Sequence, residues 1–250
     1  MTDDAEGGRP ATSDDPATPG ALDVLGRGDI EIRGRMPWSS NATFLVDVCL
    51  GGTTLPAIYK PHRGERPLWD FPDGLHLREV AAYRLSEALR WGVVPETVAR
   101  GDGPLGPGSL QRFVPADFAQ HYFTMLERPE LLGALRTICA FDLVANNADR
   151  KGGHCLLDEG GRVWGIDNGL CFHVEPGLRT VIWEFAGEPI PEPLLDDLAR
   201  FAAATGGAGL GDLLHPEEVA ATRRRAAAVV RLRRFPDPGE SRRAYPWPLV

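Results

Sequence analysis

The feature that most constrains this chain is a stretch in which two aspartates lie on either side of a short predicted hairpin. Asp149 lies in the polar loop NNADR, and Asp167 opens the tripeptide DNG. Between them run HCLLD and VWGID, two β-rich segments that turn at 159–161. Because the strands of a hairpin run out and back, both carboxylates are expected at the same mouth of a cleft.

Two carboxylates at one cleft mouth suit phosphoryl transfer. One of them can orient an attacking hydroxyl and accept its proton, while the other holds Mg²⁺ against the phosphates. Magnesium takes few protein ligands and keeps several waters, so one or two residues suffice. We therefore expect Asp149 to be the base and Asp167 to be the metal ligand.

Patterning elsewhere predicts a β-rich first part followed by a helical second part. Strands are expected at 29–35, 44–50, 55–60, 93–98 and 109–115, with a hairpin turn at 51–54. A helix is expected over 76–90, with a polar face that carries Arg78, Arg84 and Glu87. After Pro129 the pattern is helical apart from the hairpin, with long helices at 191–204 and 215–234.

This division predicts an α+β chain of two lobes with a cleft between them. The β-rich N-lobe is expected over 21–115 and the mainly helical C-lobe over 116–235. Residues 1–20 are rich in small and acidic residues, too polar to bury a face, so they are expected to be disordered. Residues 236–250 form a Pro-rich tail.

The motifs around the two aspartates resemble those of a known kinase superfamily. The runs NADR (147–150) and DNG (167–169), with His154 between them, are similar to the catalytic and metal-binding loops of phosphatidylinositol 3- and 4-kinases. The likeness is closest to the type II phosphatidylinositol 4-kinases and their actinobacterial relatives, and toxin kinases of the HipA type are more distantly similar. It covers about 34–186 and implies a two-lobed protein-kinase-like fold that binds ATP and Mg²⁺ in its cleft.

The resemblance also assigns roles to single residues. It places Asp149 and Arg150 in the catalytic loop, where Arg150 is expected to orient the loop more than to touch the substrate. Lys60 matches the strand lysine that contacts the phosphates, and Glu79 matches the helix glutamate that pairs with this lysine. Further nucleotide contacts are expected from the loop that covers the phosphates and from the linker between the lobes: Ser39, Ser40, Asn41, Gln111 and Phe113.

Two positions depart from the pattern of the superfamily. His154 stands five residues after Asp149, where an asparagine usually binds the metal. Neutral imidazole is a poorer partner for Mg²⁺ than an amide oxygen, which leaves the affinity for the metal and the choice of metal open. His154 is expected to bind the metal, to orient a phosphate, or to be a hydrogen-bonded structural residue. The covering loop has no glycine between Pro37 and Leu50, so it should be stiffer than a glycine-rich loop.

Charge and hydropathy narrow the range of partners. A formal net charge of -8 argues against non-specific binding to nucleic acids or to anionic membranes. The chain lacks an apolar run of the roughly 20 residues that span a bilayer. Residues 1–20 have neither the basic start nor the apolar stretch of a signal peptide, and the scattered cysteines fit a reducing compartment. The sequence therefore predicts a cytoplasmic protein without a transmembrane segment.

Three functions stay open at this point. Lys60, Asp149 and Asp167 together favour a kinase that transfers the γ-phosphate of ATP to a hydroxyl of a protein or small molecule. A phosphoinositide ranks lower as the acceptor, because the connection from Pro61 to Leu77 has no cysteine-rich insert for lipid attachment. His154 and the glycine-free loop favour a nucleotide-binding pseudokinase that regulates a partner protein. Transfer of AMP is the third alternative, since related folds can bind ATP in the opposite sense.

Overall fold

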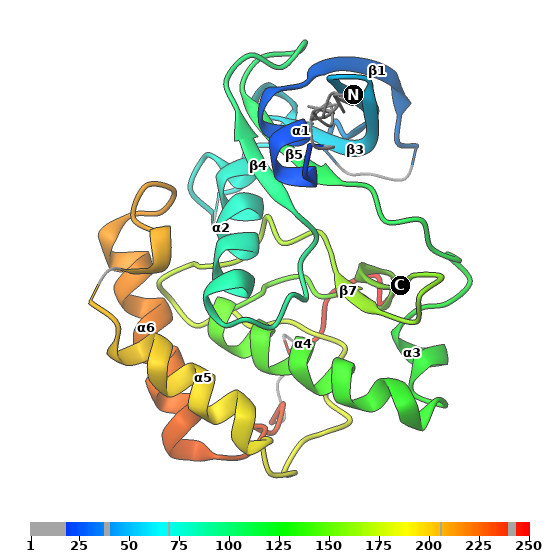
Figure 1. Cartoon of the computed structure of the whole chain (residues 1–250). Helices are drawn as coiled ribbons and strands as arrows, with labels where there is room; N and C mark the ends of the chain where they lie inside the picture. Colours follow the sequence, from blue (N-terminus) through cyan, green and yellow to red (C-terminus); the bar gives the residue numbers. More distant parts are fainter. Residues whose placement is uncertain (1–18, 38–40, 70, 206, 240–243) are drawn as a thin grey trace, which may run out of the picture.

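The structure is a computed structural model of the whole chain, shown in Figure 1. It describes residues 19–37, 41–69, 71–205, 207–239 and 244–250. Disorder was predicted for residues 1–20, and residues 1–18 of this segment lie outside the described residues. Ser39 and Ser40, predicted to contact the nucleotide, lie outside them as well.

Five antiparallel strands form one sheet in the N-terminal part. The strand order is β1-β2-β3-β5-β4, where the strands are β1 (Asp29–Arg35), β2 (Phe44–Leu50), β3 (Thr53–Pro61), β4 (Thr97–Arg100) and β5 (Gly108–Arg112). The predicted strands are confirmed, although β4 begins later than expected. The hairpin turn is shorter than predicted, because Gly51 and Gly52 make it with positive φ angles of 55° and 82°. Thr53 and Thr54 already belong to β3.

The two faces of this sheet have different neighbours. Ala57 and Tyr59 of β3 pack with Val24 and Leu25 of helix α1 (Ala21–Arg27) in a small core. Side chains alternate along a strand, so Lys60 lies on the opposite face. Helix α1 has only seven residues and was not predicted.

Helix α2 (Leu75–Ala88) packs against β4 and β5. The expectation that Arg78 faces solvent on this helix is wrong. Its guanidinium is buried, where it forms an ion pair with Glu218 and donates a hydrogen bond to the Cys171 carbonyl oxygen. An arginine can be buried on a helix when a partner from elsewhere in the chain neutralises it.

The C-terminal part is mainly helical, as predicted. Its helices are α3 (Tyr122–Met125), α4 (Leu132–Ala145), α5 (Glu192–Ala203) and α6 (Pro216–Leu232), and α6 packs against both α4 and α5. The predicted hairpin is present as β6 (Cys155–Leu157) and β7 (Val163–Gly165). Short 3-10 helices occur at η1 (His62–Gly64), η2 (Pro129–Leu131), η3 (Gly152–His154) and η4 (Gly207–Gly209).

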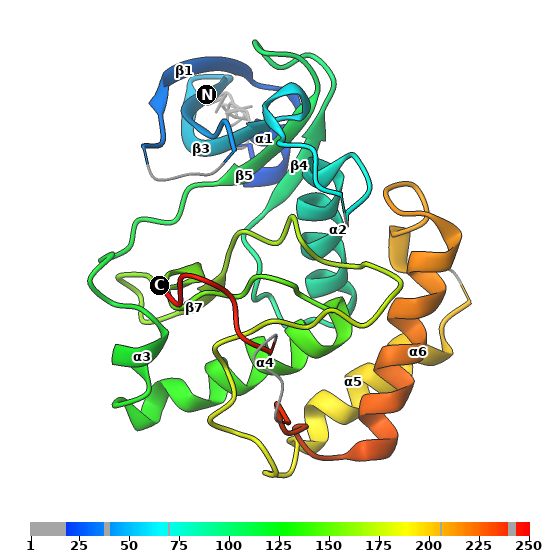
Figure 2. The same ribbon diagram turned by 180° about the vertical axis from the view of Figure 1, so that it is seen from behind.

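Figures 1 and 2 show the sheet at one end of the molecule and α4, α5 and α6 at the other, with α2 reaching from the sheet toward them. None of the helices in the described part of the chain is both long and apolar enough to cross a membrane.

The described end of the Pro-rich tail packs along the helical part and reaches the hairpin β6–β7 (Figure 2). The carbonyl oxygen of Ala244 accepts hydrogen bonds from the Thr180 N–H at 3.0 Å and from the Trp183 indole at 3.2 Å. The carbonyl oxygen of Leu249 accepts one from the Gly152 N–H at 2.7 Å. This tail therefore supports the segment that follows Asp149.

Candidate active site

A cavity of about 240 Å³ lies between the sheet and the helical part. Five of the predicted site residues line it: Asn41, Lys60, Glu79, Asp149 and Asp167. They come from the segment before β2, from β3, from α2, from the loop after α4 and from the segment after β7. The fold thus brings together residues that are far apart in the sequence.

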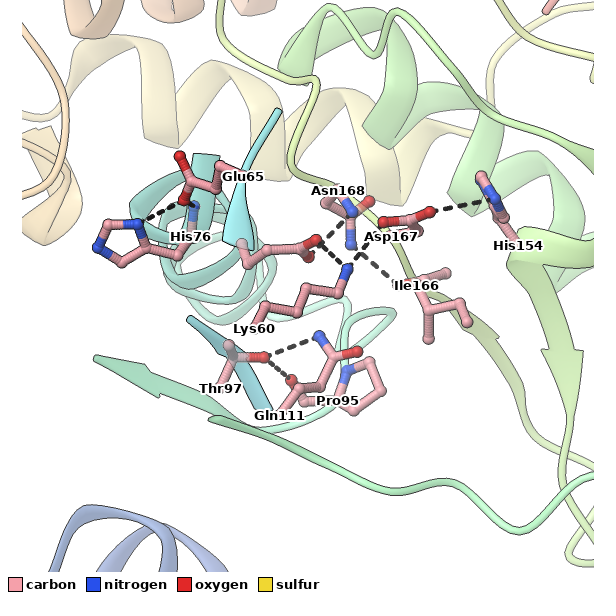
Figure 3. A network of polar contacts seen from close by, with 12 residues as sticks. Lys60, Glu65, His76, Pro95, Thr97, Gln111, His154, Ile166, Asp167 and Asn168 are labelled. Atoms are coloured by element: carbon pink, nitrogen blue, oxygen red, sulfur yellow. Dashed lines mark hydrogen bonds and ion pairs between the residues drawn. The ribbon is translucent and has the colours of Figure 1, made fainter. Parts of the chain in front are cut away.

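Lys60 is a cationic residue that lines this cavity, as is Arg66. Its ammonium forms an ion pair with Glu79 and donates a hydrogen bond to Oδ1 of Asp167 at 2.7 Å. Burial alone would lower the pKa of Lys60, but the two carboxylates outweigh burial and hold the pKa above its ordinary value. Figure 3 shows the lysine side chain pointing toward Asp167.

Glu79 holds Lys60 from the side of α2. The Glu79 side chain is almost completely buried, and its second oxygen accepts a hydrogen bond from the Asn168 N–H at 3.0 Å. One carboxylate therefore joins β3, α2 and the segment that carries Asp167. The predicted pairing of Lys60 with Glu79 is present in the structure.

The loop that carries Asp149 begins where α4 ends. Asn146 terminates this helix in the left-handed conformation, with φ of 55°, which Asn tolerates better than most residues. The Asn147 side chain then accepts a hydrogen bond from the Asp149 N–H at 2.9 Å. The Asp149 carboxylate accepts another from the Lys151 ammonium at 2.7 Å. Burial raises the pKa of Asp149, and the Lys151 ammonium partly opposes this increase.

Arg150 does not line the cavity. Its side chain is fully buried, so it cannot touch a substrate in the cleft. The guanidinium binds both oxygens of Asp142 at 3.0–3.2 Å and Oδ1 of Asn168 at 2.7 Å. It also donates to the carbonyl oxygens of His154 at 3.3 Å and Ile166 at 2.6 Å. Arg150 is therefore a positioning residue for the segments that carry both aspartates.

Asp167 adopts a left-handed backbone conformation with φ of 56°, which is uncommon for a residue with a side chain. Its two neighbours, Ile166 and Asn168, are both bound by the Arg150 guanidinium, which holds the chain in this conformation. Lys60 lowers the pKa of Asp167, so this carboxylate stays ionised well into the acid range.

His154 lies on the other side of Asp167 (Figure 3). Its Nε2 is 3.3 Å from Oδ2 of Asp167, while Oδ1 of the same carboxylate faces Lys60. Burial lowers the pKa of His154 to about 4, so the imidazole is neutral at pH 7. Nδ1 accepts a hydrogen bond from the Lys151 N–H at 3.4 Å, so Nε2 carries the proton and donates toward Oδ2 of Asp167. To bind a metal, Nε2 would need the other tautomer, with the proton on Nδ1.

The two residues predicted from the linker between the lobes do not line the cavity. The Gln111 side chain is buried and donates a hydrogen bond to the Thr97 hydroxyl at 2.9 Å (Figure 3). The Phe113 N–H donates to the Pro56 carbonyl oxygen at 3.0 Å, so it is not available to a nucleotide base. The predicted nucleotide contact of Phe113 therefore cannot be made through this N–H.

The cavity, together with His154 behind Asp167, offers a set of groups with complementary roles. The Lys60 ammonium can bind an anion, Asp167 can bind a cation, and Asp149 can accept a proton. His154 does not line the cavity, but it lies beside the Asp167 carboxylate and could share its cation. Such a set can hold a polyphosphate with a divalent cation and orient a hydroxyl beside it.

Sequence comparison establishes the family. None of the protein-family models that were compared matches the chain. The chain is 41% identical over 262 residues to protein Rv2133c of Mycobacterium tuberculosis, and this match covers 90% of the chain and 94% of Rv2133c. The chain belongs to the Rv2133c family.

Three solved structures resemble this member of the Rv2133c family, and two of them are named as kinases. Hydra Fam20 with sugar has a TM-score of 0.57 at 14% identity, covering 84% of this chain and 87% of that one. The Golgi casein kinase with Mn/ADP bound has a TM-score of 0.52 at 15% identity, covering 92% and 79%. The Helicobacter pylori proinflammatory kinase CtkA has a TM-score of 0.51 at 10% identity, covering 84% and 94%.

The predicted two-lobed protein-kinase-like fold is therefore confirmed for this member of the Rv2133c family. Identities of 10–15% show the fold and leave the activity to be argued from the site.

Sequence reasoning missed three residues that form hydrogen bonds to the candidate site residues or to Arg150: Asn147, Lys151 and Asn168. Lys151 has a recognisable signal, since a cation two residues after a candidate base can reach its carboxylate. The roles of Asn147 and Asn168 depend on contacts with Asp142, Asp149 and Arg150 that no local pattern reveals.

The first prediction concerns the buried ion pair. Arg150→Met leaves the Asp142 carboxylate buried without its partner and should reduce the free energy of unfolding by about 3–5 kcal/mol. Urea denaturation followed by circular dichroism measures this change. Arg84→Met, at an exposed position of α2, is the control and should change stability by less than about 0.5 kcal/mol. A loss below about 1 kcal/mol in Arg150→Met would show that the ion pair does not hold the site together.

Proposed function

We propose that this protein is a metal-dependent phosphotransferase that moves the γ-phosphate of ATP to a hydroxyl of a protein or small molecule. The observation that carries the proposal is that Lys60, Glu79, Asp149 and Asp167 line one cavity, with Lys60 bound to both Glu79 and Asp167. The kinase-like fold supports it as well, because it is the fold in which such a set performs phosphoryl transfer.

In this proposal each side chain has a separate task. Lys60 binds the phosphates as a point charge, and Glu79 fixes its position. Asp149 orients the acceptor hydroxyl and takes its proton, and burial, which raises its pKa, makes it a better proton acceptor than an exposed carboxylate. Lys151 keeps the Asp149 carboxylate in place through their hydrogen bond of 2.7 Å.

Asp167 and His154 are the residues that would hold the metal. The 3.3 Å between Asp167 Oδ2 and His154 Nε2 is close to the spacing of neighbouring ligands of one ion. Imidazole suits first-row transition ions better than Mg²⁺, so this pair should favour Mn²⁺. When bound, the metal neutralises charge on the phosphates. The Golgi casein kinase structure, which contains Mn and ADP, is a precedent in this fold.

The pseudokinase alternative rests on the ion pair between Lys60 and Asp167. A nucleotide and its metal must displace this contact, and a protein that only senses nucleotides could use the same displacement as its switch. The closer relation to phosphatidylinositol 3- and 4-kinases stays a prediction from the two motifs, and with it a phosphoinositide acceptor.

Calorimetric titration of ATP with Mn²⁺, Mg²⁺ or EDTA tests the nucleotide site. Wild type should bind ATP with either metal, and more tightly with Mn²⁺. Asp167→Asn should abolish the metal-dependent binding, whereas His154→Asn should keep it and shift the preference toward Mg²⁺. Asp196→Asn, at an exposed position of α5, should leave binding unchanged. Equal metal-dependent binding by wild type and Asp167→Asn would refute the assignment of Asp167.

Turnover separates the kinase from its alternatives. Asp149→Asn should keep the affinity for ATP but slow phosphate release to water or to an acceptor by about 10²- to 10⁴-fold. The measurement follows label from [γ-³²P]ATP, with [α-³²P]ATP in parallel. Transfer of the α-label would instead support AMP transfer. Binding without turnover in wild type would support the pseudokinase.

The pH profile of turnover tests the contact between Asp149 and Lys151. The base must be ionised, so kcat/KM should fall as the pH decreases through the Asp149 pKa. Lys151 favours the ionised form, and Lys151→Met should therefore raise this pKa and move the acid limb to higher pH. Lys151→Arg, which keeps the charge, is the control. An acid limb that stays in place in Lys151→Met would contradict the role of this contact.

A further inference from the structure

The N-terminus of α2 is capped by a residue from outside the helix. The N-cap residue is Gly74, which has no side chain to bind the first N–H groups of the helix. The Glu65 carboxylate takes this role and accepts hydrogen bonds from the N–H groups of Gly74, Leu75 and His76 at 3.1, 2.9 and 2.8 Å. It also bonds to Nδ1 of His76 at 2.6 Å.

This arrangement fixes Glu65 strongly. The Glu65 side chain is 8% exposed, and its four hydrogen bonds use all the lone pairs that a carboxylate offers. A negative charge is also favourable at the positive end of the helix dipole. Burial opposes ionisation, but the hydrogen bonds from His76 and the backbone outweigh it and lower the pKa of Glu65.

The surroundings of Glu65 also have the composition of a metal site. Ligand atoms of His62, Glu65 and Asp73 lie within 4.8 Å of one another. However, the Glu65 oxygens already accept four hydrogen bonds at a helix N-terminus, where a cation is disfavoured. We therefore interpret this group as a helix cap.

The segment that contains Glu65 is also attached to the loop predicted to cover the phosphates. The Ala42 N–H donates a hydrogen bond to the Gly64 carbonyl oxygen, and the Arg66 N–H donates one to Oδ1 of Asn41, both at 3.1 Å. The two segments touch so closely that a Cβ on Gly64 would lie 2.6 Å from the Ala42 Cβ. Contacts on both sides of Glu65 thus connect 41–42 to 64–66.

From these contacts we propose that Glu65 is a positioning residue that joins residues 41–42, the connection after β3 and α2 into one unit. Glu79 lies one turn beyond the capped end of α2, and Lys60 lies in β3, five residues before Glu65. The Glu65 contacts therefore connect α2, which carries Glu79, to the segment that follows the strand carrying Lys60. The inference rests on the proposed function, because it assigns the effect of Glu65 to the nucleotide site.

The contacts attach Asn41 and Ala42, which belong to the segment predicted to cover the phosphates, to 64–66. The Glu65 carboxylate attaches 64–66 in turn to the first turn of α2. A shift of 41–42 on nucleotide binding should therefore be transmitted to α2, which carries Glu79, and the reverse should hold as well.

Glu65→Gln tests the proposal, because it keeps the size of the side chain and removes the charge that caps α2. Hydrogen exchange of the protein without nucleotide should become faster both at the amides of 75–79 and at those of 41–43. The Kd for Mn-ATP should increase about 3- to 10-fold. Glu87→Gln, an exposed glutamate near the other end of α2, is the matched control and should change neither quantity. If Glu65→Gln does not fold, Glu65→Asp, which keeps the charge on a shorter side chain, is measured in its place.

A double-mutant cycle distinguishes positioning from a general loss of stability. If Glu65 acts through Glu79, then Glu65→Gln should cause little further increase in Kd in a Glu79→Gln protein. Additive effects, or faster exchange at 75–79 with none at 41–43, would overturn the proposal. The exchange measurement needs no nucleotide, so the inference can fail while wild type binds Mn-ATP. Absence of Mn-ATP binding in wild type would refute the proposed function instead.

Discussion

The site depends on one buried ion pair, between Arg150 and Asp142. Both side chains are completely removed from solvent, and a buried guanidinium is tolerated only when its charge is neutralised and its N–H groups are bound. Arg150 meets this condition by binding Asp142, two backbone carbonyl groups and Asn168. Because Arg150 directly follows Asp149, and because Ile166 and Asn168 flank Asp167, a single side chain fixes the spacing of the two acidic groups. The left-handed backbone of Asp167 is one consequence.

A second set of contacts joins the sheet to the segments that Arg150 holds. Lys60 on β3 meets Glu79 on α2 and Asp167 in the helical part, so charged groups from three elements neutralise one another. Asp167 is half exposed and its contact with Lys60 is correspondingly easy to displace, whereas Glu79 is buried and its contact is not. Phosphates arriving at Lys60 would replace Asp167 and leave Glu79 in place. The same contacts therefore hold the cleft together without a ligand and prepare it for one.

The sequence was sufficient for the strands and the long helices and for five of the residues that line the cavity, because strand alternation, helical spacing and the two aspartate motifs are local signals. It was insufficient wherever the burial or the hydrogen bonds of a residue depend on a partner that is distant in the sequence. Arg78 looked exposed from helical spacing alone, yet it is buried by Glu218, 140 positions away. The Phe113 N–H is bound to the Pro56 carbonyl oxygen, a pairing that the local sequence does not show. Glu65 caps a helix that starts ten positions later, and nothing near it in the sequence indicates this role.

The central claim is that Lys60, Asp167 and His154 form one nucleotide and metal site. A crystal structure with Mn²⁺ and a non-hydrolysable ATP analogue, measured at the manganese absorption edge, tests it most directly. The account predicts an anomalous peak between the Asp167 carboxylate and Nε2 of His154, with the Lys60 ammonium still on Glu79 and moved from Asp167 to a phosphate. A peak at His62, Glu65 and Asp73 instead, or an analogue bound away from Lys60, would contradict it.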